Sequence, residues 1–316
     1  MKAAVVAAPG ALPLYGDFED PVSQKGKHVL RVTAAPLTPL ARLRASGAHY
    51  TQHAQYPFVP GADGVGVTDK GRRLYFMFPE APFGAMAERC IVDEASCIDL
   101  PQNLADDVAA ALANPAMSSW AALRDRARLQ AGEAVLINGA TGTAGRLAVR
   151  IAKHLGAGRV VATGRRVELF DELERLGADE TIELTADADA LRAAFTALYR
   201  QGVDVVLDYL WGASAEALLA SAVAGPQGRP IRYVQIGSIS GDPISVPSAA
   251  LRSSSLELMG SGFGSLSIDS VRGAITSVFE SANETRLPIS VRRMPLSGVS
   301  KAWTESEVDG RIVFIP

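Results

Sequence analysis

The stretch from residue 134 to residue 145 constrains the fold more than any other part of this 316-residue chain. An apolar run, 134–138, ends in three closely spaced glycines, and a helical pattern follows at once. Gly139 and Gly142 suit a sharp bend and a close approach of the main chain to a ligand, and Gly145 suits tight helix packing. This junction therefore predicts a strand, a glycine turn and a helix that together hold a pyrophosphate.

The residues after the turn support this prediction. From Arg146 to Leu155, apolar residues recur every three or four positions, which is typical of a helix buried on one face. A second apolar run, Arg159 to Thr163, completes a strand–helix–strand unit within about thirty residues. The free N–H groups and the dipole of the helix would then face the phosphates. An ordinary tight turn without a ligand is the alternative. The predicted contacts in the turn are Gly139, Thr141, Gly142, Thr143, Ala144 and Gly145.

Length and composition narrow the class of protein. A single hydrophobic core seldom grows beyond about 250–300 residues, so a chain of 316 residues favours two domains. The net charge of −3, with no long basic run, does not suit nucleic acid. No apolar run is long enough to span a membrane, and Pro9 and Gly10 interrupt the N-terminal apolar stretch. We therefore expect a cytoplasmic protein with no nucleic-acid or membrane partner.

The cysteines and histidines do not predict a metal site. Cys90 and Cys97 lack the short Cys-x-x-Cys spacing of a zinc pair, and buried thiols in a reducing compartment are the expectation. His49 and His53 lie four residues apart, but Pro57 follows closely, which favours a surface loop. We therefore expect no metal.

The order of apolar segments predicts two kinds of architecture. Up to about residue 112, short apolar runs are broken by turn residues, which indicates a mainly antiparallel region. After the glycine turn, apolar strands alternate with helical stretches, which indicates a parallel sheet with helices on both faces. Strands expected near the C-terminus suggest that the chain returns to the first domain. The later elements we expect are strands at 203–207, 231–236 and 256–259, a helix at 269–280, and strands at 289–294 and 312–315.

The loop after the second strand of the unit bears on the choice of cofactor, because it lies beside the adenosine ribose in this geometry. A site for NAD would place an acidic residue there, about twenty residues past the glycines. This chain has Gly164, Arg165 and Arg166 instead. Guanidinium groups match phosphate geometry, so the loop favours NADPH. The alternative is that both arginines are solvated surface charges with Glu168 as their partner, and NADH stays open.

Several landmarks, spread over nearly the whole chain, resemble the medium-chain dehydrogenase/reductase family, and within it the zinc-independent quinone oxidoreductases. They are the segments 59–66, 131–139, 176–179, 203–208 and 310–313. The resemblance implies an α/β fold in which a Rossmann doubly wound parallel sheet is inserted into a GroES-like, mainly β catalytic domain. We assign residues 1–114 to the first part of the catalytic domain, 115–265 to the NADP-binding domain and 266–316 to the return.

The chain departs from the zinc-dependent branch of the family at the metal ligands. Ala62, in Gly61-Ala-Asp63, replaces the histidine of a Gly-His-Glu motif. Residues 32–39 lack the early cysteine, and residues 70–90 lack the four-cysteine lobe. Without a Lewis acid, alcohol oxidation loses its usual driver. The resemblance implies NADPH-dependent reduction of a quinone or of the activated C=C bond of an α,β-unsaturated carbonyl. A zinc-free carbonyl reductase, and an NADPH sensor or structural protein without turnover, are the alternatives.

The resemblance also suggests catalytic residues. Tyr50 falls near the place where related reductases have a Gly-x-Tyr, and a phenol suits hydrogen-bond donation to a developing oxyanion. Tyr56 or His53 could serve equally, and a tyrosine that only packs against the substrate is the alternative. Ser118 would bond the nicotinamide carboxamide or a substrate oxygen, whereas Trp120 is expected in the core.

Further cofactor contacts are expected in the loops that follow the later strands, at the carboxyl edge of the sheet. Plain turn chemistry is the alternative for each. The residues are Tyr209, Ile236, Gly237, Ser238, Ser261, Gly262 and Phe263. The resemblance also implies a homodimer and a small-molecule quinone or enone substrate.

Overall fold

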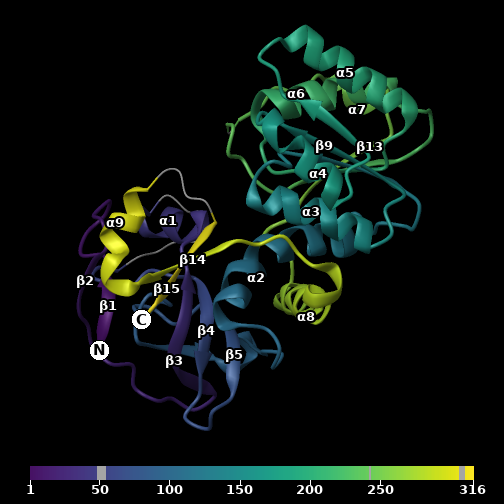
Figure 1. Cartoon of the computed structure of the whole chain (residues 1–316). Helices are drawn as coiled ribbons and strands as arrows, with labels where there is room; N and C mark the ends of the chain where they lie inside the picture. The colour runs from purple at the N-terminus through teal and green to yellow at the C-terminus, as the bar shows by residue number, and fades with distance from the viewer. Residues whose placement is uncertain (48–54, 242, 306–309) are drawn as a thin grey trace. The chain divides into compact units, whose positions relative to one another are not determined.

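The computed structural model describes residues 1–47, 55–241, 243–305 and 310–316. The chain forms two compact units, and the first is built from two separate segments, Met1–Asn114 and Ile289–Pro316. The second unit, Pro115–Pro288, lies between those segments in the sequence. Helix α2 (Asp106–Ala121) begins in the first unit and ends in the second, and a π-helical turn, Ala122–Arg126, extends it (Figure 1).

The first unit is mainly β-structure, with antiparallel pairing through most of its larger sheet. Across that sheet the strands are β14 (Val291–Pro295), β15 (Arg311–Ile315), β3 (Lys27–Pro36), β4 (Asp63–Val67), β5 (Arg73–Met77) and β7 (Cys97–Asp99), and β6 (Arg89–Asp93) pairs with β3. A separate antiparallel pair joins β1 (Lys2–Val5) and β2 (Leu14–Asp17). The helices are α1 (Pro39–Ala45) and α9 (Val299–Thr304), with short 3-10 turns at Glu94–Ser96 and Leu296–Gly298.

The core of the first unit is formed by apolar side chains from these strands, among them Leu30, Phe76 and Phe314. Cys90 and Cys97 are both buried and unbridged, as the sequence predicts. Strands β14 and β15 come from the end of the chain, and β15 pairs with β3. The predicted return of the C-terminus to the first domain's sheet is therefore present.

The second unit is a parallel sheet whose strand order reverses in the middle. Across the sheet the strands are β10 (Glu180–Glu183), β9 (Arg159–Gly164), β8 (Ala134–Asn138), β11 (Val205–Asp208), β12 (Ile231–Gln235) and β13 (Leu256–Gly260). The helices are α3 (Thr143–His154), α4 (Phe170–Leu176), α5 (Ala188–Gln201), α6 (Gly212–Ser221), α7 (Ser248–Arg252) and α8 (Ile268–Thr285), with 3-10 turns at Val167–Leu169 and Ala222–Ala224. All five residues of β8 are buried, as expected for a strand covered on both faces. The predicted doubly wound sheet is confirmed.

Helix α3 begins at Thr143, in agreement with the expectation that this helix opens near residue 143. One boundary differs from that expected from the sequence. The sequence places the return to the first domain at residue 266, whereas α8 belongs to the second unit. The apolar face of α8 is buried, and Arg150 Nε of α3 donates to the carbonyl oxygen of Thr285 at 2.7 Å, which ties α8 to the parallel sheet's helices.

Candidate functional site

The reversal of strand order between β8 and β11 identifies the carboxyl edge of the parallel sheet as the candidate ligand site. From β8 the chain continues to β9 on one side, and from β11 it continues to β12 on the other. In the strand register, Asn138 lies opposite both Thr163 and Asp208. Loops that leave neighbouring parallel strands in opposite directions leave a crevice at their carboxyl ends, and dinucleotides bind there in doubly wound sheets.

The glycine turn lies at this edge, and two of its glycines are required by close packing. Gly139 has φ +93°, and a Cβ atom on it would come within 2.8 Å of Leu210 Cγ. A Cβ on Gly145 would come within 2.4 Å of the carbonyl oxygen of Gly139, so the helix can pack this tightly only with glycine there. Gly142 differs, because it is exposed and the nearest atom to a Cβ would be 3.7 Å away. The turn is therefore closed toward the protein and open toward a ligand at Gly142.

The N-terminus of α3 is available to an anion. Gly142 is its N-cap residue and provides no side-chain cap, and the first turn holds no acidic residue. Within the described residues, the amides of Thr143, Ala144 and Gly145 donate to no protein acceptor. Unpaired N–H groups at a helix start, together with the helix dipole, favour a phosphate group.

The two arginines after β9 lie next to the turn. A Cβ on Gly164 would come within 2.3 Å of Thr141 Cγ2, so the end of β9 touches the turn directly. The Arg166 guanidinium donates to the carbonyl oxygen of Thr141, and the side chains of Arg165 and Arg166 are exposed. In the part of the chain that the structure describes, neither arginine forms an ion pair with Glu168.

A buried polar chain, which sequence reasoning missed, joins the strand ends behind the turn. Thr163 Oγ1 donates to Asn138 Oδ1 at 2.8 Å and accepts the Gly139 amide at 3.2 Å. Asn138 Nδ2 in turn donates to Asp208 at 2.8 Å. The available signal was a polar residue at the end of an otherwise apolar buried strand, which occurs at both Asn138 and Asp208.

Ser118 of α2 and Tyr209, predicted to act separately, lie together in the second unit. Their hydroxyl oxygens are 3.4 Å apart, and Ser118 Oγ also donates to the carbonyl oxygen of Pro115 at 2.7 Å. Burial raises the pKa of Tyr209 to about 12, although the hydrogen bonds from Ser118 and Ser119 act in the opposite direction. Tyr209 therefore keeps its proton at neutral pH and can act as a hydrogen-bonding group.

The loops that follow β11, β12 and β13 reach the same edge of the sheet. The amides of Ile236 and Gly237 donate to the carbonyl oxygen of Asp208, at 2.7 Å and 3.1 Å. A Cβ on Gly237 would come within 2.7 Å of the Tyr209 carbonyl oxygen, so these two loops interlock. The remaining predicted residues of this edge are Ser238, which is exposed, Ser261, whose amide donates to Gln235, and the half-buried Gly262 and Phe263.

Comparisons with known proteins agree with this architecture. A family model described as zinc-binding dehydrogenase matches residues 144–280. A probable NADPH-dependent quinone reductase of Emericella nidulans is 28% identical in an alignment that is 345 residues long with its gaps. The alignment covers 96% of each protein. The quinone oxidoreductase of Thermus thermophilus, whose structure is also known in complex with NADPH, matches with a TM-score of 0.82 and 28% identity over the full length of both chains. Quinone oxidoreductases of the medium-chain dehydrogenase/reductase family are therefore the proteins that this chain resembles in sequence and in fold.

Another relative has a different substrate in its name. A 2-methylene-furan-3-one reductase of Solanum lycopersicum is 30% identical over 193 residues, covering 56% of this chain and 49% of that protein. The fold of this chain is the predicted one, a Rossmann sheet inserted into a GroES-like, mainly β domain. The names of the Emericella nidulans and Thermus thermophilus proteins agree with the predicted quinone oxidoreductase branch.

The predicted proton donor is not among the residues that the structure describes. Tyr50 and its alternative His53 lie outside the described residues. Tyr56, the other alternative, is half-buried, and its ring packs edge-on against Phe58 with ring centroids 5.3 Å apart. Trp120 is buried, as expected for a core residue.

The position of the family's zinc ligand holds no donor atom in this chain. Ala62 is buried, and the neighbouring Asp63 accepts the Tyr75 hydroxyl at 2.9 Å. Burial raises the pKa of Asp63 to about 6, while the Tyr75 hydrogen bond and the charge of Arg311 act in the opposite direction. Among the described residues, no group of three or more His, Cys, Asp or Glu side chains is arranged to hold a metal ion.

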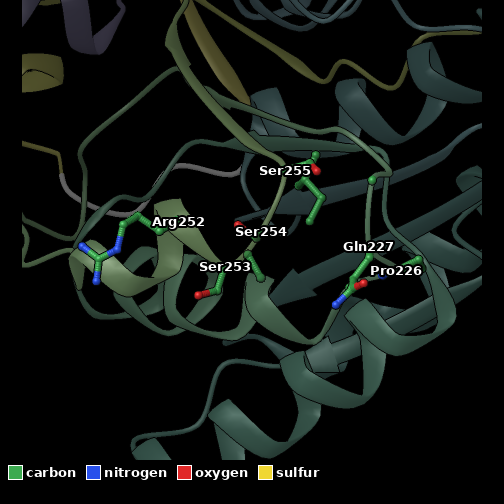
Figure 2. Close-up of a pocket in the computed structure, with 10 residues that line it drawn as sticks. Pro226, Gln227, Arg252, Ser253, Ser254 and Ser255 are labelled. Carbon is green, nitrogen blue, oxygen red and sulfur yellow. The ribbon is translucent and has the colours of Figure 1, made fainter.

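A polar pocket of about 270 Å³ lies at the opposite edge of the parallel sheet, beside the loops that enter β12 and β13 (Figure 2). Gln227 and the run from Arg252 to Ser255 contribute to its lining. Arg252 donates to Ser248 Oγ at 3.2 Å, so its guanidinium turns back along α7. None of the predicted site residues lines this pocket, which separates it from the glycine turn.

No described helix combines the length and the apolar character needed to cross a membrane.

Proposed function

We propose that this protein is an NADPH-dependent oxidoreductase that reduces quinones or the activated C=C bond of α,β-unsaturated carbonyls without zinc. The observation that carries the proposal is the open N-terminus of α3 with two exposed arginines beside it. The free amides of Thr143, Ala144 and Gly145 suit the pyrophosphate, and Arg165 and Arg166 suit a 2′-phosphate. An NAD-specific site would need an acidic residue where these arginines lie.

The residues at the sheet edge fit such a cofactor. Gly142 is open where the main chain would approach the phosphates, and Gly139, Thr141, Gly145 and Gly164 give the turn its shape. The proposed contacts with the remainder of the cofactor follow β11, β12 and β13. They are Tyr209, Ile236, Gly237, Ser238, Ser261, Gly262 and Phe263.

The chemistry divides between cofactor and protein. When bound, NADPH supplies a hydride for an electrophilic carbon of the substrate. Ser118, next to Tyr209, would hold the nicotinamide carboxamide or a substrate oxygen through its hydroxyl group. Tyr50 would donate a hydrogen bond or a proton to the enolate or quinol oxygen that forms, which stabilises the developing negative charge. Zinc independence is supported by Ala62, since its methyl side chain cannot replace the family's histidine ligand.

The names of the relatives support both substrate classes. One relative is a probable NADPH-dependent quinone reductase, and another is a reductase of 2-methylene-furan-3-one. A homodimer is part of the proposal, and strand β13 supports it. It is an edge strand of the parallel sheet, and its Leu258 side chain is exposed. The open edge of such a strand can pair with a second copy of the chain. The cytoplasmic location stays a prediction.

The proposal is tested with the purified protein by calorimetric titration of NADPH and NADH, followed by NADPH oxidation with a panel of quinones, enones and saturated carbonyls. We expect tighter binding of NADPH than of NADH, and turnover with quinones or enones. Tight NADPH binding with no turnover of any acceptor would favour the sensor alternative. Reduction of saturated carbonyls alone would favour a carbonyl reductase, and binding of neither dinucleotide would exclude the proposal.

A further inference from the structure

Asp208 is the most highly connected buried polar side chain at the edge of the parallel sheet. Its carboxyl group accepts hydrogen bonds from four donors among the described residues. They are Asn138 Nδ2 at 2.8 Å, the Leu210 amide at 2.9 Å, the Trp211 amide at 3.1 Å and the Tyr233 hydroxyl at 2.7 Å. The first three share Oδ1, and Tyr233 alone bonds Oδ2. Asp208 is fully buried, so each of these bonds offsets part of a large desolvation cost.

The bonds to Oδ1 hold a strained loop. Trp211 has φ +59° and ψ −151°, a backbone conformation that residues with a side chain rarely adopt. Such a conformation persists only where neighbouring groups enforce it. The two amides on Oδ1 are those of Leu210 and Trp211, so the acceptor lies where the loop leaves ordinary backbone geometry.

This loop contacts the glycine turn. The side chain of Leu210 lies over Gly139, where it would be within 2.8 Å of a Cβ atom. The preceding residue, Tyr209, is the partner of Ser118. A displacement of the loop would therefore move both the turn proposed to hold the phosphates and the hydroxyl pair proposed to lie near the nicotinamide.

Asp208 is also connected to the glycine turn through Asn138 and Thr163. Asn138 Nδ2 bonds its Oδ1, Asn138 Oδ1 accepts the Thr163 hydroxyl, and Thr163 Oγ1 accepts the Gly139 amide. Asn138 and Asp208 end neighbouring strands, Thr163 is the last residue but one of β9, and all three residues are buried. Burial raises the pKa of Tyr233, and the nearby Asp208 adds to that effect, so the hydroxyl group on Oδ2 keeps its proton.

We infer that Asp208 is a positioning residue that aligns the glycine turn and the loop after β11 for the dinucleotide, through the acceptor at its Oδ1. The inference rests on the proposed function. Asp208 does not have to touch the cofactor in order to act. The position requires an acceptor for three donors rather than a negative charge. Asparagine should therefore replace Asp208 better than alanine does.

The test compares Asp208→Ala, Asp208→Asn and the matched control Asp204→Ala. Asp204 directly precedes the same strand, is buried, and accepts from Arg229 and from the Ala134 amide at the opposite edge of the sheet. An asparagine at 208 can keep an acceptor in the place of Oδ1 while its NH₂ group donates to the Tyr233 hydroxyl. We therefore expect the NADPH Kd to rise roughly tenfold or more in Asp208→Ala, and to stay within about threefold of wild type in Asp208→Asn and Asp204→Ala.

Hydrogen exchange of the apo protein gives a readout that does not depend on the cofactor. The Leu210 and Trp211 amides should exchange about tenfold faster in Asp208→Ala than in wild type, with no such change in Asp204→Ala. An unchanged NADPH Kd in Asp208→Ala, or equal effects of the two alanine variants on Kd, would overturn the inference. If wild type binds no NADPH, the proposed function fails, while unaltered exchange at these two amides would still refute the positioning role by itself.

A second pair of variants tests the positioning role if Asp208→Ala does not fold. Thr163→Val keeps the shape of the side chain but removes the hydroxyl group that joins Asn138 to the Gly139 amide. Thr163→Ser keeps that hydroxyl. We expect the NADPH Kd to rise about fivefold in Thr163→Val and to stay near the wild-type value in Thr163→Ser. Equal affinities in the two variants would overturn the inference.

Discussion

Gly164 offers a sharp test of how closely β9 approaches the glycine turn. A Cβ atom at this position would lie 2.3 Å from Thr141 Cγ2 and 2.9 Å from Thr141 Oγ1, about 1 Å short of ordinary contact with the methyl carbon. Thr141 is buried, and its carbonyl oxygen accepts the Arg166 guanidinium, so the turn cannot move without disturbing that bond. Gly164→Ala should therefore displace the turn as well as strain the sheet.

The expected magnitude follows from two opposing effects. Overpacking by one carbon in a tight site costs about 1–3 kcal/mol. Replacing glycine by alanine recovers about 0.4–1 kcal/mol, because the unfolded chain loses conformational freedom. The net loss in the free energy of unfolding should be about 1–2 kcal/mol. Urea unfolding followed by circular dichroism measures this loss, and titration with NADPH measures the accompanying weakening of binding.

A double mutant and a control isolate the contact. Thr141→Ala removes both Cγ2 and Oγ1 and leaves only Thr141 Cβ, at 3.1 Å from the new methyl group. Gly164→Ala combined with Thr141→Ala should therefore be about 1 kcal/mol more stable than the sum of the single effects predicts. Gly260→Ala, at the end of β13, has no atom within 4 Å of the added carbon and should not lose stability. Wild-type stability in Gly164→Ala, or strict additivity in the double mutant, would refute the reasoning.

Three further predictions concern the cofactor, the proton donor and the buried acid. Arg165→Glu with Arg166→Glu should weaken NADPH binding at least about tenfold more than NADH binding, because only NADPH carries the 2′-phosphate; equal losses for both dinucleotides would remove the role given to these arginines. Tyr50→Phe should lower turnover about tenfold or more while leaving the NADPH Kd nearly unaltered, and unchanged turnover would dismiss it as the donor. The pKa of Asp63 is about 6 in the folded protein and 3.8 in the reference state, so the native state binds this proton more tightly than the unfolded chain does. Its stabilising contribution is complete below pH 3.8 and is lost as the pH rises through about 6. Wild type should lose about 3 kcal/mol over this window relative to Asp63→Asn in urea unfolding at stepped pH, and parallel pH profiles would contradict this.

The local part of the candidate site was predictable from the sequence because its causes act over a few residues. Glycine spacing, an apolar run and a helical repeat were sufficient for β8, the turn and α3, since each depends on neighbours along the chain. The arginines after β9 could be identified by their distance from the glycines. The end of the second unit was placed too early, because the attachment of α8 depends on a bond from Arg150 to Thr285 that no local pattern reveals.

By itself, the sequence determined that a strand, a glycine turn and a helix would form, and that positive charge would follow the next strand. Only the tertiary structure decided what surrounds the turn. Asn138 and Asp208 are 70 residues apart in the chain, and Asn138 and Thr163 are 25 apart, yet strand register places them side by side. The contact of Leu210 with Gly139 and that of Thr141 with Gly164 arise in the same way. Side-chain hydrogen bonds and steric contacts act over a few ångströms in space, so their partners are set by the pairing of strands rather than by separation along the chain.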